Sequence, residues 1–291
     1  MSKLSFCLLA HRSVIAVGGP DRVEFLQGLI SNDTTKVKAD RAIWAALLTP
    51  QGRFLNDMFV IDGGDDTLLL ETERERAPAL ARKLKMYTLR SKVTVEDRSA
   101  AMDVWVVFGA DAEQVLPLSD TISFVDPRLH ELGVRVLAPV NKQVSLVLAA
   151  KGAKLVEPEA YDSLRLELGV PDGSRDLPVE KALLLESGFD ELNGVDWQKG
   201  CYMGQELTAR TKYRGLVRKR LFPVRVEGPL PAPGTAVHLD GLDVGEIRSG
   251  SGNRAIAMLR LEATHGGTLT ADDARIVPEV PRWMRLPEQP S

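Results

Sequence analysis

A cysteine between two glycines is the feature of this chain that most suggests chemistry. Gly200 and Gly204 flank Cys201, and glycine allows a positive φ or a close approach of backbone on either side of the thiol. Residues 205–213 are compatible with a helix, so Cys201 is expected just before a helix N-terminus. The dipole of that helix and the ammonium of Lys199 would both favour the thiolate. These residues predict a reactive sulfur at Cys201, with Lys199 beside it as a second catalytic group.

Local chemistry leaves a second interpretation of Cys201 open, because a lone cysteine is more often a small buried apolar residue than a nucleophile. The other cysteine, Cys7, lies in an apolar run and is expected in the core. Two cysteines in 291 residues do not make the spaced framework of a secreted protein. The N-terminus lacks the pattern of a signal peptide. The chain is therefore expected to be cytoplasmic.

Composition excludes several classes of site. The 37 basic and 40 acidic residues give a net charge of -3, which provides no general attraction to nucleic acid or anionic membranes. The four histidines are scattered and no Cys-x-x-Cys pair is present, so a structural zinc site is not expected. An all-cysteine iron–sulfur cluster takes four thiolates, and a membrane span takes roughly 18 consecutive apolar residues. No metal site, no membrane contact and no nucleic-acid partner is predicted.

Strand-like and helical runs alternate through the first two thirds of the chain. An apolar, β-branched strand at 13–17 precedes a helical run in which Val23, Leu26 and Ile30 share one face. Residues 63–66 should form a turn between two further strands. The short connections imply mostly antiparallel sheets and an α+β fold class. Other strands are predicted at 44–48, 54–61, 67–70, 93–95, 104–108, 122–125 and 134–137, and helices at 77–87 and ending at 164–168.

From Leu221 on, the sequence changes to short strands separated by Gly and Pro, and the boundary is expected near Leu216. This pattern is typical of a small β-barrel. Its strands are predicted at 222–226, 236–239, 244–249 and 255–259. We expect a first α+β half at 1–100, a second half at 101–215 that can interleave with the first, a barrel at 216–284 and a tail at 285–291.

Several motifs resemble those of the YgfZ family of folate-binding proteins, which is related to the aminomethyltransferase of the glycine cleavage system. Within residues 199–215 they are Lys199-Gly200-Cys201-Tyr202, Gly204-Gln205-Glu206, Ala209-Arg210 and Tyr213-Arg214-Gly215. Residues 25–33, 48–53 and 189–195 also resemble that family. The resemblance covers nearly the whole chain.

The resemblance implies an aminomethyltransferase-like fold, with ferredoxin-like α+β halves and a C-terminal small β-barrel around a central hole. It implies tetrahydrofolate, or a derivative, as cofactor. It also implies a supporting role in the assembly or repair of iron–sulfur proteins, with cluster assembly factors or client enzymes as partners.

The resemblance also assigns residues to folate. In the aminomethyltransferases the segment matching residues 54–58 usually carries two adjacent acids, whereas here Asn56 takes the first place and only Asp57 is acidic. An amide cannot act as the carboxylate that orients or deprotonates the folate nitrogen. Asp57 is assigned to folate binding, with a structural hydrogen-bond acceptor as the alternative. Glu167 is assigned to the amino group and ring N–H of the pterin, which one carboxylate can accept together.

Tyr202, Gln205 and Arg210 complete the residues assigned to folate. Arg210 also opens a run, 210–220, with six basic residues. A solvated edge, an RNA-binding patch and a cradle for the carboxylates of a folate tail all fit this run. RNA is the least favoured of the three, because Tyr213 is the only aromatic residue among the charges.

Three functions stay open at this point. The first is an accessory protein that binds tetrahydrofolate and supports iron–sulfur enzymes through Cys201 and Lys199. The second is a folate-dependent transferase of aminomethyl or methyl groups that uses Asp57 and Glu167. The third is a binding module in which Cys201 only packs. The sequence does not decide whether the chain is an enzyme.

Overall fold

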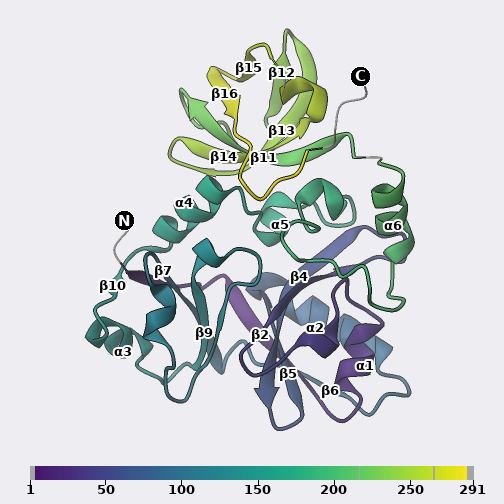
Figure 1. Ribbon diagram of the computed structural model, residues 1–291, viewed down its shortest axis with the longest axis vertical. Coiled ribbons are helices and arrows are strands. Elements are labelled where there is room, and N and C mark those ends of the chain that lie inside the picture. The colour runs from purple at the N-terminus through teal and green to yellow at the C-terminus, as the bar shows by residue number, and fades with distance from the viewer. Residues whose placement is uncertain (1–3, 216, 265, 287–291) are drawn as a thin grey trace. The chain divides into compact units, whose positions relative to one another are not determined.

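The computed structural model describes residues 4–215, 217–264 and 266–286 (Figure 1). The chain divides into two compact units, and each is assembled from separate stretches of sequence. The first unit comprises Met1–Leu48, Leu55–Pro158 and Asn193–Met203, and the second comprises Thr49–Phe54, Glu159–Leu192 and Gly204–Ser291. Asn193–Met203, called here the Cys201 segment, therefore belongs to the first unit.

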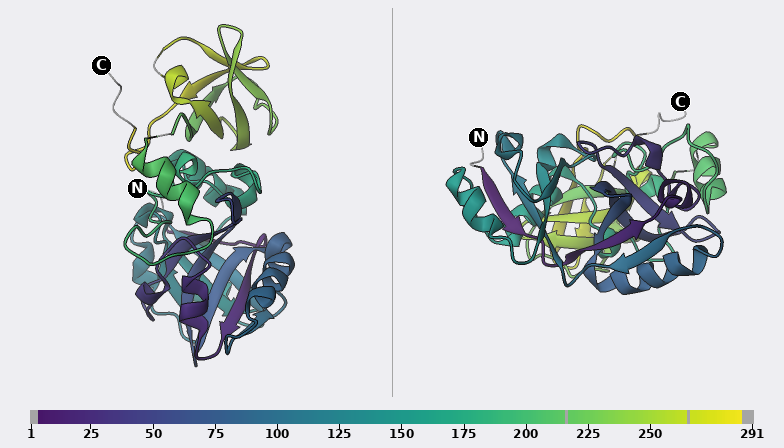
Figure 2. Two further views of the ribbon diagram at one scale, coloured as in Figure 1. Left: turned by 90° about the vertical axis from the view of Figure 1, so that its right-hand side faces the viewer. Right: turned by 90° about the horizontal axis from the view of Figure 1, so that it is seen from below.

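The first unit contains a five-stranded sheet with the order β3-β4-β5-β2-β6. The pairs β2/β5, β2/β6 and β4/β5 are antiparallel, as the short connections predicted. Helix α2 (Ala77–Tyr87) has the predicted bounds and packs against β2 and β6 (Figure 2). The strands are β2 (Arg12–Gly18), β3 (Ile43–Leu48), β4 (Phe54–Gly64), β5 (Thr67–Glu73) and β6 (Thr94–Asp97).

The turn between β4 and β5 lies within the predicted residues 63–66 but takes only the last two of them. Strand β4 continues through both glycines, and Asp65 and Asp66 form the turn with φ of 44° and 55°. Two consecutive residues with positive φ give the tight hairpin whose twist matches that of the strands. Asp tolerates this backbone region better than most side chains.

A second five-stranded sheet of the first unit has the order β10-β1-β7-β9-β8. Only the short β10 is parallel to its neighbour. The rings of Phe59 on β4 and Phe124 on β8 lie 5.7 Å apart, so the two sheets face each other. The strands are β1 (Ser5–Leu8), β7 (Met102–Phe108), β8 (Ile122–Val125), β9 (Val134–Pro139) and β10 (Lys154–Leu155), and helix α3 (Val144–Ala150) precedes β10.

The second unit contains α4 (Pro158–Leu168), the short α5 (Gly173–Asp176), α6 (Gln205–Tyr213) and a closed barrel of order β11-β14-β13-β12-β15-β16 (Figure 1). The α+β class with a C-terminal barrel is confirmed. Leu216, where the barrel boundary was expected, lies outside the described residues, and the predicted tail is described only to residue 286. The strands are β11 (Lys219–Glu227), β12 (Ala236–Leu239), β13 (Leu242–Ser251), β14 (Arg254–Arg260), β15 (Leu269–Ala271) and β16 (Ala274–Pro278).

Across residues 4–215, 217–264 and 266–286, no helix combines the length and apolar character needed to cross a membrane.

Candidate functional site

The Cys201 segment is fastened to the loop that follows α1 (Arg22–Gln27). Ser31 Oγ donates to the carbonyl of Gly194 at 2.6 Å, and Asn32 Nδ2 donates to the carbonyl of Asn193 at 2.7 Å. The amide of Asp196 donates to the carbonyl of Ser31 at 3.0 Å. Ser31 and Asn32 are buried, so these bonds are shielded from competing water and hold the start of the segment in one place.

Lys199 continues this attachment with its side chain. Its Nζ donates to the carbonyls of Gln27, Ile30 and Asn32 at 2.9, 2.6 and 2.8 Å, and it lies 5.0 Å from the ring centre of Tyr202. An ammonium has three N–H donors, so all three are occupied. The prediction that Lys199 is a catalytic group beside the thiol stays untested, but its ammonium is engaged with backbone carbonyls.

Burial changes the ionisation of Lys199. Removal from water lowers the pKa of its ammonium to about 8, although the carboxylates of Asp33 and Asp196 act in the opposite direction. Asp196 also accepts from the backbone amides of Gln198 and Lys199 at 2.7 and 3.1 Å and pairs with Lys36. The ammonium is therefore held mainly by carbonyl dipoles, without a carboxylate in hydrogen-bond contact.

Cys201 is exposed between two attached neighbours. Tyr202 is buried, and the amide of Met203 donates to the carbonyl of Gly28 at 3.1 Å. Tyr87 Oη donates to Met203 Sδ at 3.5 Å. With Lys199 bound on the other side, the backbone is held both before and after Cys201. The geometry thus presents an unbridged thiol to solvent on an immobilised stretch of chain.

Asp57 lies in a buried network of charges between the two sheets of the first unit and is 2% exposed. Trp44 Nε1 donates to Asp57 Oδ2 at 3.1 Å, and Arg12 lies 3.9 Å from Oδ1. Glu71 Oε1 accepts from Arg12 and from Arg135 at 2.7 Å each. The assignment of Asp57 to folate is not tested, but these contacts are those of the structural acceptor that the sequence left as the alternative.

Asp126 belongs to the same network, because Arg135 donates both to it and to Glu71. Arg128 donates to both of its carboxylate oxygens, at 2.9 and 2.7 Å, and Arg135 donates at 3.2 Å. Burial alone would raise the pKa of Asp126, but the two guanidinium groups hold it below its ordinary value. Both guanidinium groups also lie over the ring of Phe59. Each buried charge thus has partners, as the low dielectric of an interior requires.

Asn56 points away from this network, because adjacent side chains of a strand point to opposite faces. It is 5% exposed, and its Nδ2 has no hydrogen-bond partner among the described residues. A buried N–H without a partner costs free energy unless a water or a ligand accepts from it. Asn56 thus offers a hydrogen-bond donor at the position where the transferases carry an acid.

Three predicted folate residues lie in the second unit. Glu167 is exposed in the last turn of α4, and no described residue forms a hydrogen bond or ion pair with it. The predicted helix after Cys201 is confirmed as α6, in which Gln205 is the first residue and Arg210 is exposed near the end. Gly204 precedes it with φ of 80°, a value that favours glycine.

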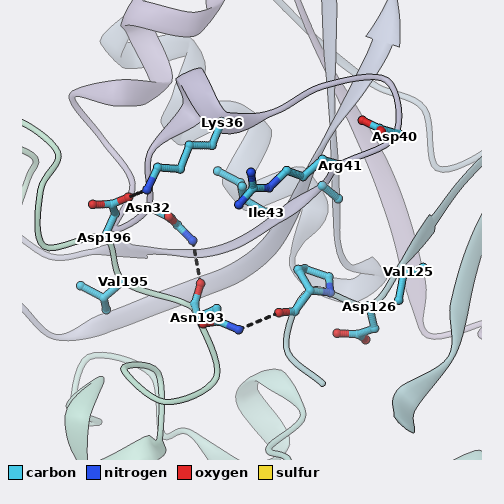
Figure 3. Close-up of a pocket in the computed structure, with 12 residues that line it drawn as sticks. Asn32, Lys36, Asp40, Arg41, Ile43, Val125, Asp126, Asn193, Val195 and Asp196 are labelled. Carbon is cyan, nitrogen blue, oxygen red and sulfur yellow. Dashed lines mark hydrogen bonds and ion pairs between the residues drawn. The ribbon is translucent and has the colours of Figure 1, made fainter. Parts of the chain in front are cut away.

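A cavity of about 440 Å³ in the first unit was not predicted from the sequence (Figure 3). It shares Asn193, Val195 and Asp196 with the Cys201 segment, and the side chain of Arg41 forms no hydrogen bond or ion pair with any described residue. No local motif marks the cavity, since three distant stretches of chain form it. Its lining residues are Asn32, Lys36, Asp40, Arg41, Ala42, Ile43, Val125, Asp126, Pro127, Asn193, Val195 and Asp196.

Family models match two parts of the chain. Residues 5–129 match the GCVT N-terminal domain, and residues 218–286 match the CAF17 C-terminal beta-barrel domain. A crystal structure of the glycine cleavage system aminomethyltransferase T from Bartonella henselae covers 95% of this chain and 85% of its own, with a TM-score of 0.79 and 17% identity. At this identity the match concerns the fold, and it confirms the predicted aminomethyltransferase-like architecture.

Curated relatives match over most of the chain. The mitochondrial iron-sulfur cluster assembly factor IBA57 of Mus musculus is 37% identical, and that of Homo sapiens is 38% identical. Each alignment covers 89% of this chain and 78% of the relative. The homologue from Mycosarcoma maydis is 34% identical over 78% of this chain and 59% of its own. The prediction of a cytoplasmic location is wrong by this comparison, because all three are named as mitochondrial proteins.

Proposed function

Because this chain belongs to the family of the iron-sulfur cluster assembly factor IBA57, we propose that it is a tetrahydrofolate-binding accessory protein in the assembly or repair of iron–sulfur proteins. The observation that carries the proposal is the exposed Cys201, held between the bound Lys199 and the buried Tyr202. The likeness of residues 199–215 to the YgfZ motif supports the same role. The folate-binding part rests on that motif and on the aminomethyltransferase-like fold.

In this role Cys201 supplies one thiolate to iron that is handled as cargo. A cluster takes four such ligands, and Cys7 is fully buried, so the other ligands must come from a client or carrier protein. Fixing the backbone on both sides of Cys201 lowers the entropy lost when a partner approaches. The first unit thus contributes a preorganised single ligand.

Glu167 is the residue that we propose as the anchor of the pterin. Its exposed carboxylate is not engaged by another described side chain, so both oxygens can accept from adjacent N–H groups. Tyr202, Gln205 and Arg210 keep the folate-binding roles assigned from the motif. Bound folate would bring one-carbon chemistry, and Glu167 would hold its pterin.

The alternative of a one-carbon transferase has weaker support. That function needs a carboxylate at the folate nitrogen, and the acid retained at this place is Asp57. Asp57 lies between the two sheets, bonded to Trp44 and near Arg12, while Asn56 points to the other face. The side chains present here can therefore bind and orient folate better than they can deprotonate it.

The thiol is tested in a strain that lacks the gene, by measuring the activity of a cluster-dependent dehydratase after expression of variants. Cys201→Ser should restore less than a tenth of the activity restored by the wild type, because serine binds iron poorly. Cys7→Ala is the matched control and should restore nearly all of it, since Cys7 lies in the core. Full restoration by Cys201→Ser would remove the thiol from the function.

Folate binding is tested separately by titrating the purified protein with tetrahydrofolate in a calorimeter. Glu167→Gln should weaken binding at least tenfold, because an amide cannot accept two hydrogen bonds from the pterin without presenting an N–H to one of them. Glu159→Gln, in the first turn of the same helix, is the control and should bind like the wild type. Equal affinities of all three proteins would exclude Glu167 as the anchor.

A further inference from the structure

The end of α2 and the loop after it expose large apolar side chains that most folded proteins would bury. Met86 is 72% exposed and Leu89 is 91% exposed, and Tyr87 is at the border of exposure. The three lie within four residues, so they form a patch and not isolated surface residues. An exposed apolar group of this kind is typical of a site that another molecule covers.

Five basic residues surround this patch: Arg82, Lys83, Lys85, Arg90 and Lys92. None of their side chains forms a hydrogen bond or an ion pair with a residue in the described part of the chain. No acidic residue occurs from 77 to 92, although the whole chain has a net charge of -3. We call residues 82–92 the basic apolar surface. Its basic side chains form no ion pair with a described residue, and the carboxylate of Asp21 reaches it only through the backbone amide of Lys92, at 2.7 Å.

The basic run at 210–220 differs in this respect. Lys212 pairs with Asp190 at 2.7 Å, and Arg220 pairs with Glu191 at 2.6 Å. The positive charge of this run, which could have suited RNA or the carboxylates of folate, is therefore partly neutralised within its own unit. The run also exposes Tyr213, but three of its six basic side chains pair with carboxylates, whereas none of the five in the basic apolar surface pairs with a described residue.

The basic apolar surface is connected to the thiol. Tyr87 Oη donates to Met203 Sδ at 3.5 Å, and Met203 follows Cys201 by two residues. Two residues of chain span at most about 7 Å, so the Cα atoms of Cys201 and Met203 lie within that distance. A partner seated on Tyr87 and Leu89 would have its own ligands within reach of the exposed thiol.

We propose that the basic apolar surface docks an acidic protein partner and brings it to Cys201. The partner should carry an apolar centre that covers Met86 and Leu89, surrounded by carboxylates that meet the five basic side chains. A protein fits better than RNA, because the apolar centre matches the anatomy of a protein interface. It fits better than a membrane, because the surface adjoins the segment of the exposed Cys201 through Tyr87 and Met203. Charge complementarity would also speed encounter. That the partner carries iron–sulfur clusters rests on the proposed function.

Binding is tested on the full chain with a defined probe, a fluorescent peptide in which Leu-Phe is placed between two runs of three glutamates. We expect binding that weakens at least tenfold between 50 and 300 mM salt. Lys83→Glu/Lys85→Glu/Arg90→Glu should weaken it at least tenfold, and Leu89→Ser alone at least threefold. Lys151→Glu/Lys154→Glu, which reverses exposed charges elsewhere in the first unit, should change it less than twofold.

Two further probes test the other classes of partner. Oligouridylate and vesicles with one third phosphatidylserine should bind at least tenfold more weakly than the peptide. Tighter binding of either probe, or equal peptide binding by the triple variant and the wild type, would overturn the proposal. These measurements need no iron, so they do not depend on the proposed function.

The connection to the thiol is tested by the dehydratase assay. The triple variant should restore less than a third of the wild-type activity while it binds tetrahydrofolate and reacts with a thiol reagent at the wild-type rate. Full activity would disprove the coupling to Cys201. If Cys201→Ser also restored full activity, the proposed function would fail while the peptide result would still decide the docking surface.

Discussion

Two regions of the first unit hold cations that are buried or half-buried, in opposite ways. Between the sheets, Arg12, Arg128 and Arg135 meet the carboxylates of Asp126 and Glu71. In the Cys201 segment, a single Lys199 is held by three carbonyls without a carboxylate in hydrogen-bond contact. In the first arrangement the guanidinium groups of Arg128 and Arg135 hold the pKa of Asp126 below its ordinary value. The second leaves an ammonium whose pKa falls to about 8.

The difference shows that one unit uses separate interactions to stabilise its sheets and to hold the exposed thiol in place. Charge pairs joined to several strands make the sheets mutually dependent, and removal of one partner leaves a charge buried alone. Carbonyl bonds from one lysine fix only a short stretch of chain and leave the adjacent thiol exposed. We therefore expect mutations in the network to affect the whole unit and mutations at Lys199 to affect mainly the Cys201 segment.

The largest effect is expected for Glu71→Gln, which keeps the shape of the side chain and removes its charge. Arg12 and Arg135 would lose a buried carboxylate partner, so unfolding should become easier by about 3–5 kcal/mol. Urea unfolding followed by tryptophan fluorescence measures this loss. Asp120→Asn, which removes an exposed pair with Lys142, should leave the midpoint unchanged. Equal midpoints for Glu71→Gln and the wild type would show that the network does not stabilise the sheets.

A smaller effect is expected for Lys199→Met, which keeps the apolar stem and removes three hydrogen bonds. The loss of stability should be about 2 kcal/mol, because the freed carbonyls can recover water. Proteolysis should cut near Cys201 at least tenfold faster than in the wild type. Lys36→Met, which removes the more exposed pair with Asp196, is the control and should cost less than about 1 kcal/mol. Unchanged proteolysis would show that Lys199 does not fasten the segment.

The smallest effect is a pH dependence carried by Lys199. Its pKa is about 8 in the folded chain, against an ordinary value of 10.5, so the unfolded chain binds more protons between these values. Stability contributed by this group should therefore rise as the pH increases from about 8 to 10.5, and be constant below that range. Urea unfolding of wild type and Lys199→Met across this range isolates the contribution. If the stability of both proteins changed with pH in the same way, Lys199 would not be the source of the pH dependence.

Local patterns predicted much of the fold. Helix α2 and strands β8 and β12 have the predicted bounds, because their apolar spacing and flanking turn residues agree. Strands β15 and β16 were missed, since runs of only three and five residues give little signal even where β16 contains the β-branched pair Ile276-Val277. The short β10 pairs in parallel with β1, which lies far away in the sequence, and no local feature of the sequence indicates such a pairing. The resemblance supplied the architecture that local patterns could not.

Only those features of the candidate site that are local in the sequence could be predicted. The sequence pattern placed Cys201 just before a helix, and α6 confirms that position, while the reactivity of the thiol stays a prediction. The carbonyl partners of Lys199 lie 167–172 residues earlier, and the partners of Arg135 lie on other strands, so neither could be read from spacing. Asp57 shows the same limit. Its position in a motif suggested that it binds folate, but its contacts depend on which face of the strand it occupies, and that face lies between the two sheets.

The attachment of Lys199 to Gln27, Ile30 and Asn32 has a consequence for how the protein matures. During synthesis the loop after α1 leaves the ribosome early, but its lysine partner is made only after Glu159–Leu192 of the second unit. Contacts so distant in sequence form late, because a long loop must close first. The thiol can thus be presented only after the chain has been made through Met203, and a product that ends before Lys199 cannot hold it in this geometry.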